Sequence, residues 1–253
     1  MGESKMKKKL SVLIVDDDPN IGDTLTDVLN AKGYDAGFVT SGREALSIIK
    51  KKNIDAILLD IRMPGMNGVE TLKRIKGQSP LTSVVMITAY AEDELVNHAR
   101  ANGALHILSK PLDIDKIIGF LKKQEILKTI FIVDDDKAFC DSLKDAIEIH
   151  SYDVAVVNNA QEAIKTFSKR KYGIILLDMK LDGETGLDVA EAIKKQGYKC
   201  AIIMMSAYKK EFQPLLDKAG QINNFIEKPF EIQDILKLLN EISRKRLKEV
   251  LAA

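Results

Sequence analysis

Acidic side chains that could bind a metal and receive a phosphoryl group stand out in the first half of the chain. Asp16, Asp17 and Asp18 follow one short apolar run, and Asp60 follows another. Crowded carboxylates repel one another, and a hard divalent cation such as Mg²⁺ removes that cost because it prefers oxygen ligands. A carboxylate can also accept a phosphoryl group covalently. These aspartates therefore indicate a metal-dependent phosphoryl acceptor.

A hydroxyl and an ammonium follow two further apolar runs, at Thr88 and Lys110. Both groups suit phosphoryl oxygens, over which charge spreads during transfer. An Asp-Asp pair after a strand is commonly a helix cap instead. Because proline follows Asp18, we expect that residue to cap a helix, and we expect the same of Asp136.

The same set of residues returns later in the chain. Positions 16, 60, 88 and 110 correspond to Asp134, Asp178, Ser206 and Lys228, each 118 residues further on. A shared offset at four separated places indicates two complete domains of one design. We place their boundaries at residues 8–125 and 126–253. The join, near residues 124–128, contains no run of Gly, Pro or Ser, which favours a short, stiff connection.

Strand and helix patterns alternate within each repeat. In the first repeat, continuous apolar runs at residues 11–15, 54–59 and 84–88 indicate buried parallel strands, and residues 34–39 and 107–109 supply two more. Amphipathic helices fall between these strands, the first ending before Gly33. The prediction is an α/β chain with two doubly wound, five-stranded parallel sheets of flavodoxin-like type, (βα)5 each. In such sheets, sites form beyond the carboxyl ends of the strands.

Composition excludes several classes of protein. The formal net charge is +1, which gives no reason to expect nucleic acid or an anionic membrane as partner. Two cysteines make a disulfide framework implausible and suggest a reduced, cytoplasmic setting. The apolar run after the basic start is too short for a signal peptide, and no run reaches the roughly 20 residues that span a bilayer. We therefore expect no membrane insertion.

The motifs together resemble a known family. Val-Asp-Asp-Asp, Leu-Leu-Asp-Ile-Arg-Met-Pro-Gly-Met-Asn-Gly, Ile-Thr-Ala-Tyr and Ser-Lys-Pro are similar to the receiver domain of two-component response regulators. The resemblance covers nearly the whole chain, as two receivers in tandem, and the motifs are specific as a set.

The resemblance implies a role for each site residue. Asp60 would accept the phosphoryl group, and Asp17 and Asp60 would bind Mg²⁺ directly, with Asp16 acting mainly through water. The backbone carbonyl of Arg62 would complete the protein ligands. Lys110 would pair with the phosphoryl group and Thr88 would close on it. The second receiver would use Asp134, Asp135, Asp178, the Lys180 carbonyl, Ser206 and Lys228.

The resemblance also implies a signalling protein and not an enzyme, with phosphotransfer and autodephosphorylation as its only chemistry. The donor would be a histidine kinase or a histidine phosphotransfer protein. Only one helix follows the second unit, so we expect output through protein contacts, without a DNA-binding domain. A downstream protein or a second copy would use the helix 4–strand 5–helix 5 face, near residues 92–123 and 209–240.

The two repeats depart from the family pattern in different places. The family often places an aromatic residue three positions before the lysine, as a switch that reports phosphorylation. Phe225 stands there in the second unit and Ile107 in the first. Arg62, Lys180, Tyr90 and Tyr208 should flank the phosphoryl group, and we hypothesise that they obstruct the hydrolytic water.

Three other functions remain as alternatives. A phosphohydrolase resembling haloacid dehalogenases needs Asp-x-Asp after a strand, and Asp60-Ile61-Arg62 and Asp178-Met179-Lys180 do not match. A flavodoxin-like cofactor binder needs a phosphate-cradling loop, where Asp16 and its neighbours would repel phosphate. A scaffold that works without phosphorylation stays open, at least for the second unit.

Overall fold

A computed structural model describes residues 9–89, 94–197, 200–207 and 224–252. The chain divides into two compact units. Unit 1 comprises Met1–Lys122 with Arg244–Ala253, and unit 2 comprises Lys123–Ser243. The boundaries 8–125 and 126–253 stay a prediction: this division places the join between Lys122 and Lys123 and assigns the carboxyl end to unit 1, where the Arg244 guanidinium donates hydrogen bonds to the Gly103 carbonyl. Each unit is described separately below.

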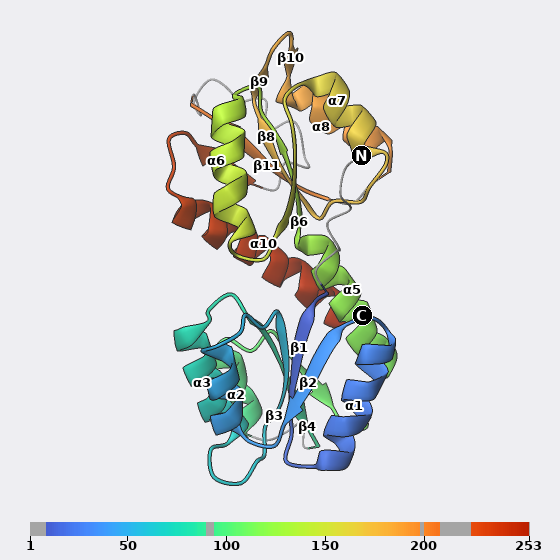
Figure 1. The fold of residues 1–253 in the computed structure, drawn as a ribbon, viewed down its shortest axis with the longest axis vertical. Helices are drawn as coiled ribbons and strands as arrows, with labels where there is room; N and C mark the ends of the chain where they lie inside the picture. Colours follow the sequence, from blue (N-terminus) through green and yellow to red (C-terminus); the bar gives the residue numbers. More distant parts are fainter. Residues whose placement is uncertain (1–8, 90–93, 198–199, 208–223, 253) are drawn as a thin grey trace. The chain divides into compact units, whose positions relative to one another are not determined.

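Unit 1 is a five-stranded parallel sheet in the order β2-β1-β3-β4-β5. The strands are β1 (Ser11–Val15), β2 (Asp35–Val39), β3 (Ala56–Asp60), β4 (Ser83–Thr88) and β5 (His106–Ser109). The helices are α1 (Pro19–Ala31), α2 (Gly42–Ile49), α3 (Gly68–Gln78), α4 (Glu94–Ala101) and α5 (Ile114–Leu127). Figure 1 shows α2 and α3 on one face of this sheet and α1 on the other. The predicted doubly wound (βα)5 architecture is confirmed for this unit.

Unit 2 repeats the arrangement, with strand order β12-β11-β8-β6-β7. Its parallel strands are β6 (Thr129–Val133), β7 (Asp153–Val157), β8 (Ile174–Asp178), β11 (Ala201–Ser206) and β12 (Asn224–Glu227). Its described helices are α6 (Lys137–Glu148), α7 (Ala160–Phe167), α8 (Gly186–Lys195) and the first part of α10 (Ile232–Ala252), whose residues from Arg244 onward belong to unit 1. The fourth helix that the repeat predicts would fall between β11 and β12, mostly outside the described residues. The second five-stranded sheet is confirmed.

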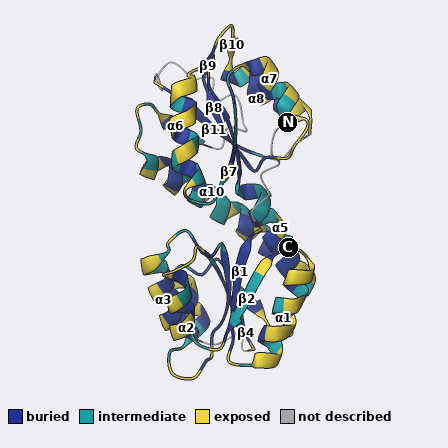
Figure 2. Ribbon diagram, in the orientation of Figure 1, coloured by how far each residue is buried: buried dark blue, intermediate teal, exposed yellow. Residues whose placement is uncertain are grey.

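The sheets form because their strands are apolar on both faces. Every residue of β1, β3, β6 and β8 is buried, as Figure 2 shows for the centre of each unit. In unit 1, alternate residues such as Leu13 and Val15 pack against Leu46, Leu72 and Ile75 of the helices on one face. Helices on both faces remove this surface from water, which is the condition for a continuous apolar parallel strand.

Polar side chains set where the helices begin. Asp18 accepts a hydrogen bond from the Asn20 amide at the start of α1, and Asp136 accepts one from the Phe139 amide at the start of α6. Both predicted N-caps are confirmed. Gly33 follows α1 with φ of 94°, a left-handed conformation that glycine adopts without a steric penalty. Among the described helices, none has the length and apolar character needed to cross a membrane.

Candidate functional site

The carboxyl ends of four strands in unit 1 bring the predicted site residues together. The Lys110 ammonium lies 2.8 Å from Asp16 Oδ2 and 3.0 Å from Asp60 Oδ1. Lys110 follows β5, Asp16 follows β1, and Asp60 is the last residue of β3. They lie close together because these parallel strands end at the same edge of the sheet. A cavity of about 180 Å³ opens beside them. Its lining includes Asp16, Asp17, Asp60, Arg62, Thr88 and Lys110.

The main chain holds both carboxylates in place. Asp60 Oδ2 accepts a hydrogen bond of 2.8 Å from the Arg62 amide, and Asp16 Oδ1 accepts one of 3.0 Å from the Asp18 amide. The Lys110 amide donates to the Thr88 carbonyl at 2.8 Å, which ties β5 to the end of β4. Each carboxylate therefore has one oxygen fixed by backbone and the other facing the lysine.

A glycine lets helix α3 approach the backbone of Asp60. A Cβ at Gly68 would lie 2.1 Å from the Asp60 carbonyl oxygen, and the Gly68 amide donates to the Ile61 carbonyl at 2.9 Å. Gly186 repeats this contact in unit 2, where a Cβ would lie 2.1 Å from the Asp178 carbonyl oxygen. Gly68 ends the motif quoted above, but neither glycine was assigned a role from the sequence. Their shared offset is the signal that could have identified them.

Burial and the lysine act in opposite directions on the charges of unit 1. Burial raises the pKa of Asp60 above its ordinary value, and it outweighs the hydrogen bond and positive charge of Lys110. Burial also opposes the charge on Lys110, but the hydrogen bonds to Asp16 and Asp60 outweigh it, so the pKa of Lys110 is raised. The lysine therefore stays cationic between two carboxylates.

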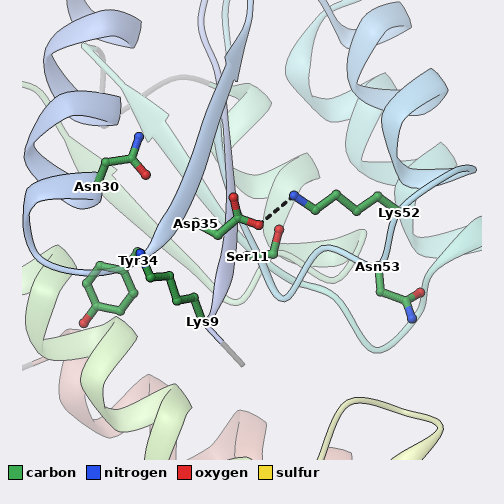
Figure 3. A pocket seen from close by; sticks show the side chains of 7 residues that line it. All are labelled: Lys9, Ser11, Asn30, Tyr34, Asp35, Lys52 and Asn53. Atoms are coloured by element: carbon green, nitrogen blue, oxygen red, sulfur yellow. Dashed lines mark hydrogen bonds and ion pairs between the residues drawn. The ribbon is translucent and has the colours of Figure 1, made fainter. Parts of the chain in front are cut away.

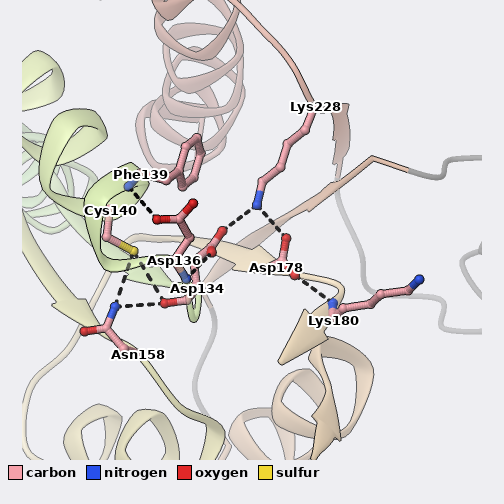
Figure 4. A network of polar contacts seen from close by, with 8 residues as sticks. All are labelled: Asp134, Asp136, Phe139, Cys140, Asn158, Asp178, Lys180 and Lys228. Carbon is pink, nitrogen blue, oxygen red and sulfur yellow. Dashed lines mark hydrogen bonds and ion pairs between the residues drawn. The ribbon is translucent and has the colours of Figure 1, made fainter. Parts of the chain in front are cut away.

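Unit 2 contains the same constellation, drawn in Figure 4. The Lys228 ammonium lies 2.5 Å from Asp134 Oδ2 and 2.6 Å from Asp178 Oδ1. Asp178 Oδ2 accepts a hydrogen bond of 2.7 Å from the Lys180 amide. Burial raises the pKa of Asp134 in spite of the hydrogen bond from Lys228. The backbone of Asp136 holds the other oxygen of Asp134 at 3.0 Å.

The remaining predicted residues lie at the same edges. Thr88 and Ser206 end β4 and β11 and are buried. Asp17 and Asp135 follow β1 and β6 and are exposed. Tyr90 and Tyr208 lie outside the described residues.

Mg²⁺ prefers oxygen ligands, which the acidic side chains of the site supply. In the part of the chain that the structure describes, no three or more His, Cys, Asp or Glu side chains surround a common metal position. However, Mg²⁺ usually keeps several water molecules and needs only one or two carboxylates. Asp16, Asp17, Asp60 and Arg62 all line the same cavity. The residues present therefore fit a hydrated Mg²⁺.

The loop that follows Asp60 differs from the loop that follows Asp178. Unit 1 has Pro64 and Gly65 after Asp60, and Gly65 has φ of 75°. Unit 2 forms a short antiparallel hairpin instead, from β9 (Lys180–Leu181) and β10 (Glu184–Thr185). Asp182 lies in its turn. Hairpin pairing replaces the proline as the element that orders this loop.

Sequence analysis also missed the aromatic residues beside Lys228. The ammonium lies 4.5 Å from the centroid of the Phe139 ring, and the Phe230 ring meets Phe139 edge-on with centroids 5.9 Å apart. At the 118-residue offset, unit 1 has Ile21 and Leu112. A comparison of the two repeats position by position would have shown this difference.

A larger cavity lies away from these residues. It measures about 420 Å³ and lies at the amino ends of the unit 1 strands, where Lys52 forms an ion pair of 2.7 Å with Asp35 (Figure 3). The buried Ser11 hydroxyl beside it has no hydrogen-bond partner. The residues that could take part in phosphoryl chemistry all lie at the opposite edge of the sheet, so size does not identify the site here.

Comparisons with known proteins agree with the geometry. The sequence profile of the response regulator receiver domain matches residues 12–122 and 130–240. A response regulator receiver protein of Anaeromyxobacter sp. (strain Fw109-5) is 24% identical over 234 residues, which cover 92% of this chain and 95% of that protein. Sporulation initiation phosphotransferase F of Bacillus subtilis (strain 168) is 40% identical over 118 residues, covering 47% of this chain and 95% of that protein.

A solved structure is similar to one receiver-sized part of the chain. Chemotaxis protein CheY4 of Vibrio cholerae is 31% identical with a TM-score of 0.43, and the match covers 46% of this chain and 98% of that chain. The family profile matches two separate segments that together span most of the sequence. The chain therefore belongs to the response regulator receiver domain family and carries two receiver domains in tandem.

Proposed function

We propose that this chain is a phosphoacceptor signalling protein in which Asp60, and Asp178 in the second receiver, take a phosphoryl group from a phosphohistidine. The donor is a histidine kinase or a histidine phosphotransfer protein. The observation that carries the proposal is the lysine held between two buried carboxylates at the strand ends, present in both units. Receiver domains as a family interact with such donors.

The geometry supports a direct displacement at phosphorus. Asp60 Oδ1, the oxygen that faces Lys110, attacks phosphorus, the bond from phosphorus to the donor nitrogen breaks, and its electron pair leaves with the imidazole. The Arg62 amide orients the carboxylate, and Lys110 can move from the carboxylates to the phosphoryl oxygens. The Thr88 hydroxyl ends the neighbouring strand and closes on the product. Mg²⁺, held by Asp17, Asp60 and the Arg62 carbonyl with Asp16 acting through water, would neutralise the charge that accumulates on the phosphoryl oxygens.

The same roles apply in unit 2 to Asp135, Asp178, the Lys180 carbonyl, Ser206 and Lys228, with Asp134 acting through water. The phosphoaspartate is then lost by hydrolysis at the same site. The protein accordingly transfers and releases its own phosphoryl group and does not turn over a separate substrate. We place it in the cytoplasm, where ATP-dependent kinases supply the donor.

Output occurs through protein contacts. We assign it to the helix 4–strand 5–helix 5 face of each unit, which a downstream protein or a second copy of the chain would bind. In unit 1 this face includes α4, β5 and α5. In unit 2 part of it lies outside the described residues. Phosphorylation biases this face through the loops that follow the acceptor and the hydroxyl residue.

The test is phosphorylation stoichiometry by intact mass, with a small phosphodonor and Mg²⁺. The variants are Asp60→Ala and Asp178→Ala, with Asp27→Ala on the exposed face of α1 as the matched control. We expect two phosphoryl groups on the wild type and on the control, and one on each acceptor variant. A single group, lost in only one variant, would mean one receiver and one docking domain. If no donor, including a histidine-phosphorylated protein, phosphorylates the chain, the proposal is wrong and the scaffold that works without phosphorylation is the remaining function.

A further inference from the structure

The site lysine of unit 2 has an aromatic neighbour in addition to its two carboxylates. Its ammonium lies 4.5 Å from the centroid of the Phe139 ring, within the range of a cation–π contact. Figure 4 shows Phe139 beside the pair formed by Lys228 and Asp134. The Phe230 ring meets the Phe139 ring at 76°, an edge-to-face arrangement that fixes the orientation of both rings.

Local structure places Phe139 at this point. Phe139 lies in the first turn of α6, and its amide donates a 3.0 Å hydrogen bond to the N-cap side chain of Asp136. Asp136 itself follows Asp134, which accepts a hydrogen bond from Lys228. The hydrogen bond that caps the helix therefore also fixes the backbone position from which the Phe139 ring extends towards Lys228. Phe139 is half-buried, so one part of the ring faces the ammonium and another faces solvent.

Unit 1 lacks this feature at the corresponding positions. Ile21 and Leu112 stand 118 residues before Phe139 and Phe230, and aliphatic side chains have no electron-rich face for a cation. The exposure of the two lysines is nearly equal, 24% for the Lys110 side chain and 22% for that of Lys228. The exposed fraction of the lysine side chain therefore does not distinguish the sites. The two contacts of Lys228, at 2.5 and 2.6 Å, are nevertheless shorter than those of Lys110, at 2.8 and 3.0 Å.

We propose that Phe139 is a positioning residue of the second receiver, whose ring face holds the Lys228 ammonium between Asp134 and Asp178 before phosphoryl transfer. Without the ring, the flexible lysine side chain would lose rotamer freedom only when its ammonium is fixed at the phosphoryl group, which costs conformational entropy at that step. A charge already in place near the acceptor needs less rearrangement when negative charge develops on the phosphoryl oxygens. The two receivers thus differ in how far the lysine is preorganised. The consequence for transfer rests on the proposed function of Asp178.

The test compares Phe139→Ile, which installs the residue of unit 1, with Phe139→Tyr, which keeps a ring. The probe is phosphoramidate: a carboxylate oxygen bonds to phosphorus, the phosphorus–nitrogen bond breaks, and its electron pair leaves on ammonia. We expect Phe139→Ile to slow phosphorylation of Asp178 by about threefold to tenfold. Phe139→Tyr should stay near the wild type. The rate at Asp60 in the same molecules, resolved by peptide mapping, is the internal control.

A second readout reports the contact without any reaction. Protons over the face of an aromatic ring have NMR signals shifted upfield, so the Lys228 ε-methylene signals should be upfield in the wild type and in Phe139→Tyr. They should move to ordinary positions in Phe139→Ile. An unchanged Lys228 signal and an unchanged rate at Asp178 in Phe139→Ile would overturn the proposal. A lost shift with an unchanged rate would also overturn it, because the ring would then have no effect on transfer.

The failure of the proposed function has a separate signature. If Asp178 accepts no phosphoryl group in the wild type while the Lys228 signals depend on the ring, the assignment of Asp178 as acceptor is overturned and the positioning contact is supported. An equal fall in rate at Asp60 and Asp178 would indicate a general loss of folded protein. That result would count against a positioning role.

Discussion

At the scale of single residues, one ammonium compensates two carboxylates in each receiver. In unit 1 the side chains of Asp16 and Asp60 are only 1% and 7% exposed, so water does little to screen them. Removing one partner of a buried ion pair leaves an uncompensated charge, which costs more than the pair contributed. Removing one partner of an exposed ion pair costs little, because water solvates the charge that remains. The location of a lysine therefore decides what its loss costs.

We expect Lys110→Ala to lower the free energy of unfolding in EDTA by on the order of 2 kcal/mol. Lys52→Ala is the matched control, because Lys52 also forms an ion pair but both side chains are about half exposed. That control should lose at most about 0.5 kcal/mol. Adding Mg²⁺ should restore part of the loss at Lys110, since a cation again neutralises the carboxylates. The free energy of unfolding is measured by urea denaturation. An equal decrease in Lys110→Ala and Lys52→Ala would show that burial does not decide the cost of losing the lysine.

His106 gives a prediction about pH. Burial lowers the pKa of His106, and the positive charges of Arg100, Lys116 and Lys248 lower it further. The unfolded chain therefore binds the proton more tightly than the folded protein does. The stability contribution is present above the ordinary histidine pKa and is lost as pH falls through it towards the folded value.

The measurement is a histidine C2–H titration by NMR, followed by urea melts of the wild type and His106→Gln between pH 5 and 8. We expect the folded midpoint of His106 to lie below that of the same residue in urea. His106→Gln should flatten the fall in stability at the acidic end. A folded midpoint at or above the urea value would show that burial does not dominate.

At the scale of elements, the acceptor strands depend on the helices that follow them. The amino end of α3 packs against the backbone of Asp60 through Gly68, and α8 packs against Asp178 through Gly186. A side chain at either glycine would overlap the acceptor carbonyl, so the helix or the strand end must shift. In unit 2 a capping box between Thr185 and Asp188 fixes the start of α8 in addition.

We expect Gly68→Ala to destabilise the protein by about 1–3 kcal/mol or more, because its Cβ meets backbone and not a flexible side chain. It should also slow phosphorylation of Asp60, whose carboxylate moves with that backbone. Gly119→Ala, inside α5 with no atom within 4 Å of the added Cβ, is the control. It should stabilise by about 0.5–1 kcal/mol. A neutral Gly68→Ala in thermal and urea melts would refute the close approach.

At the scale of the whole molecule, the chain consists of two repeats with the same sheet topology and with local differences between them. Both units have a lysine between two carboxylates and a cis peptide bond before proline, at Lys110–Pro111 and Lys228–Pro229. Phe225 is half-buried in β12 and packs against its core, as Ile107 does in β5. Whether these positions report phosphorylation differently stays a prediction. The proposed function therefore predicts two metal ions and two acceptors per chain.

We expect isothermal titration with Mg²⁺ to give two sites per chain. Asp17→Asn and Asp135→Asn should each leave one, because each removes a proposed ligand from a single unit. Asp27→Asn, on the exposed face of α1, is the control and should retain both. Removing Mg²⁺ with EDTA should lower the melting temperature, since a ligand that binds only the folded state stabilises it. Two sites retained in Asp17→Asn would remove that residue from the ligand set.

Much of the fold could be predicted from residue patterns. The repeat, the parallel sheets and the capping of α1 by Asp18 and of α6 by Asp136 all rest on local signals: apolar runs, helical periodicity and capping side chains. The gathering of Asp16, Asp60, Thr88 and Lys110 at one edge followed from a general property of parallel sheets. These features can be predicted without knowing which side chains are in contact.

The contacts that distinguish the two sites could not be predicted in this way. Lys110 meets Asp16 across 94 positions of sequence, and Lys228 meets Asp178 across 50. Phe139 reaches Lys228 because the start of α6 and the end of β12 lie at the same edge of the sheet. The sequence predicted which groups share an edge, because strand direction determines that. Which of them touch, and how closely, depends on long-range packing, which no local pattern encodes.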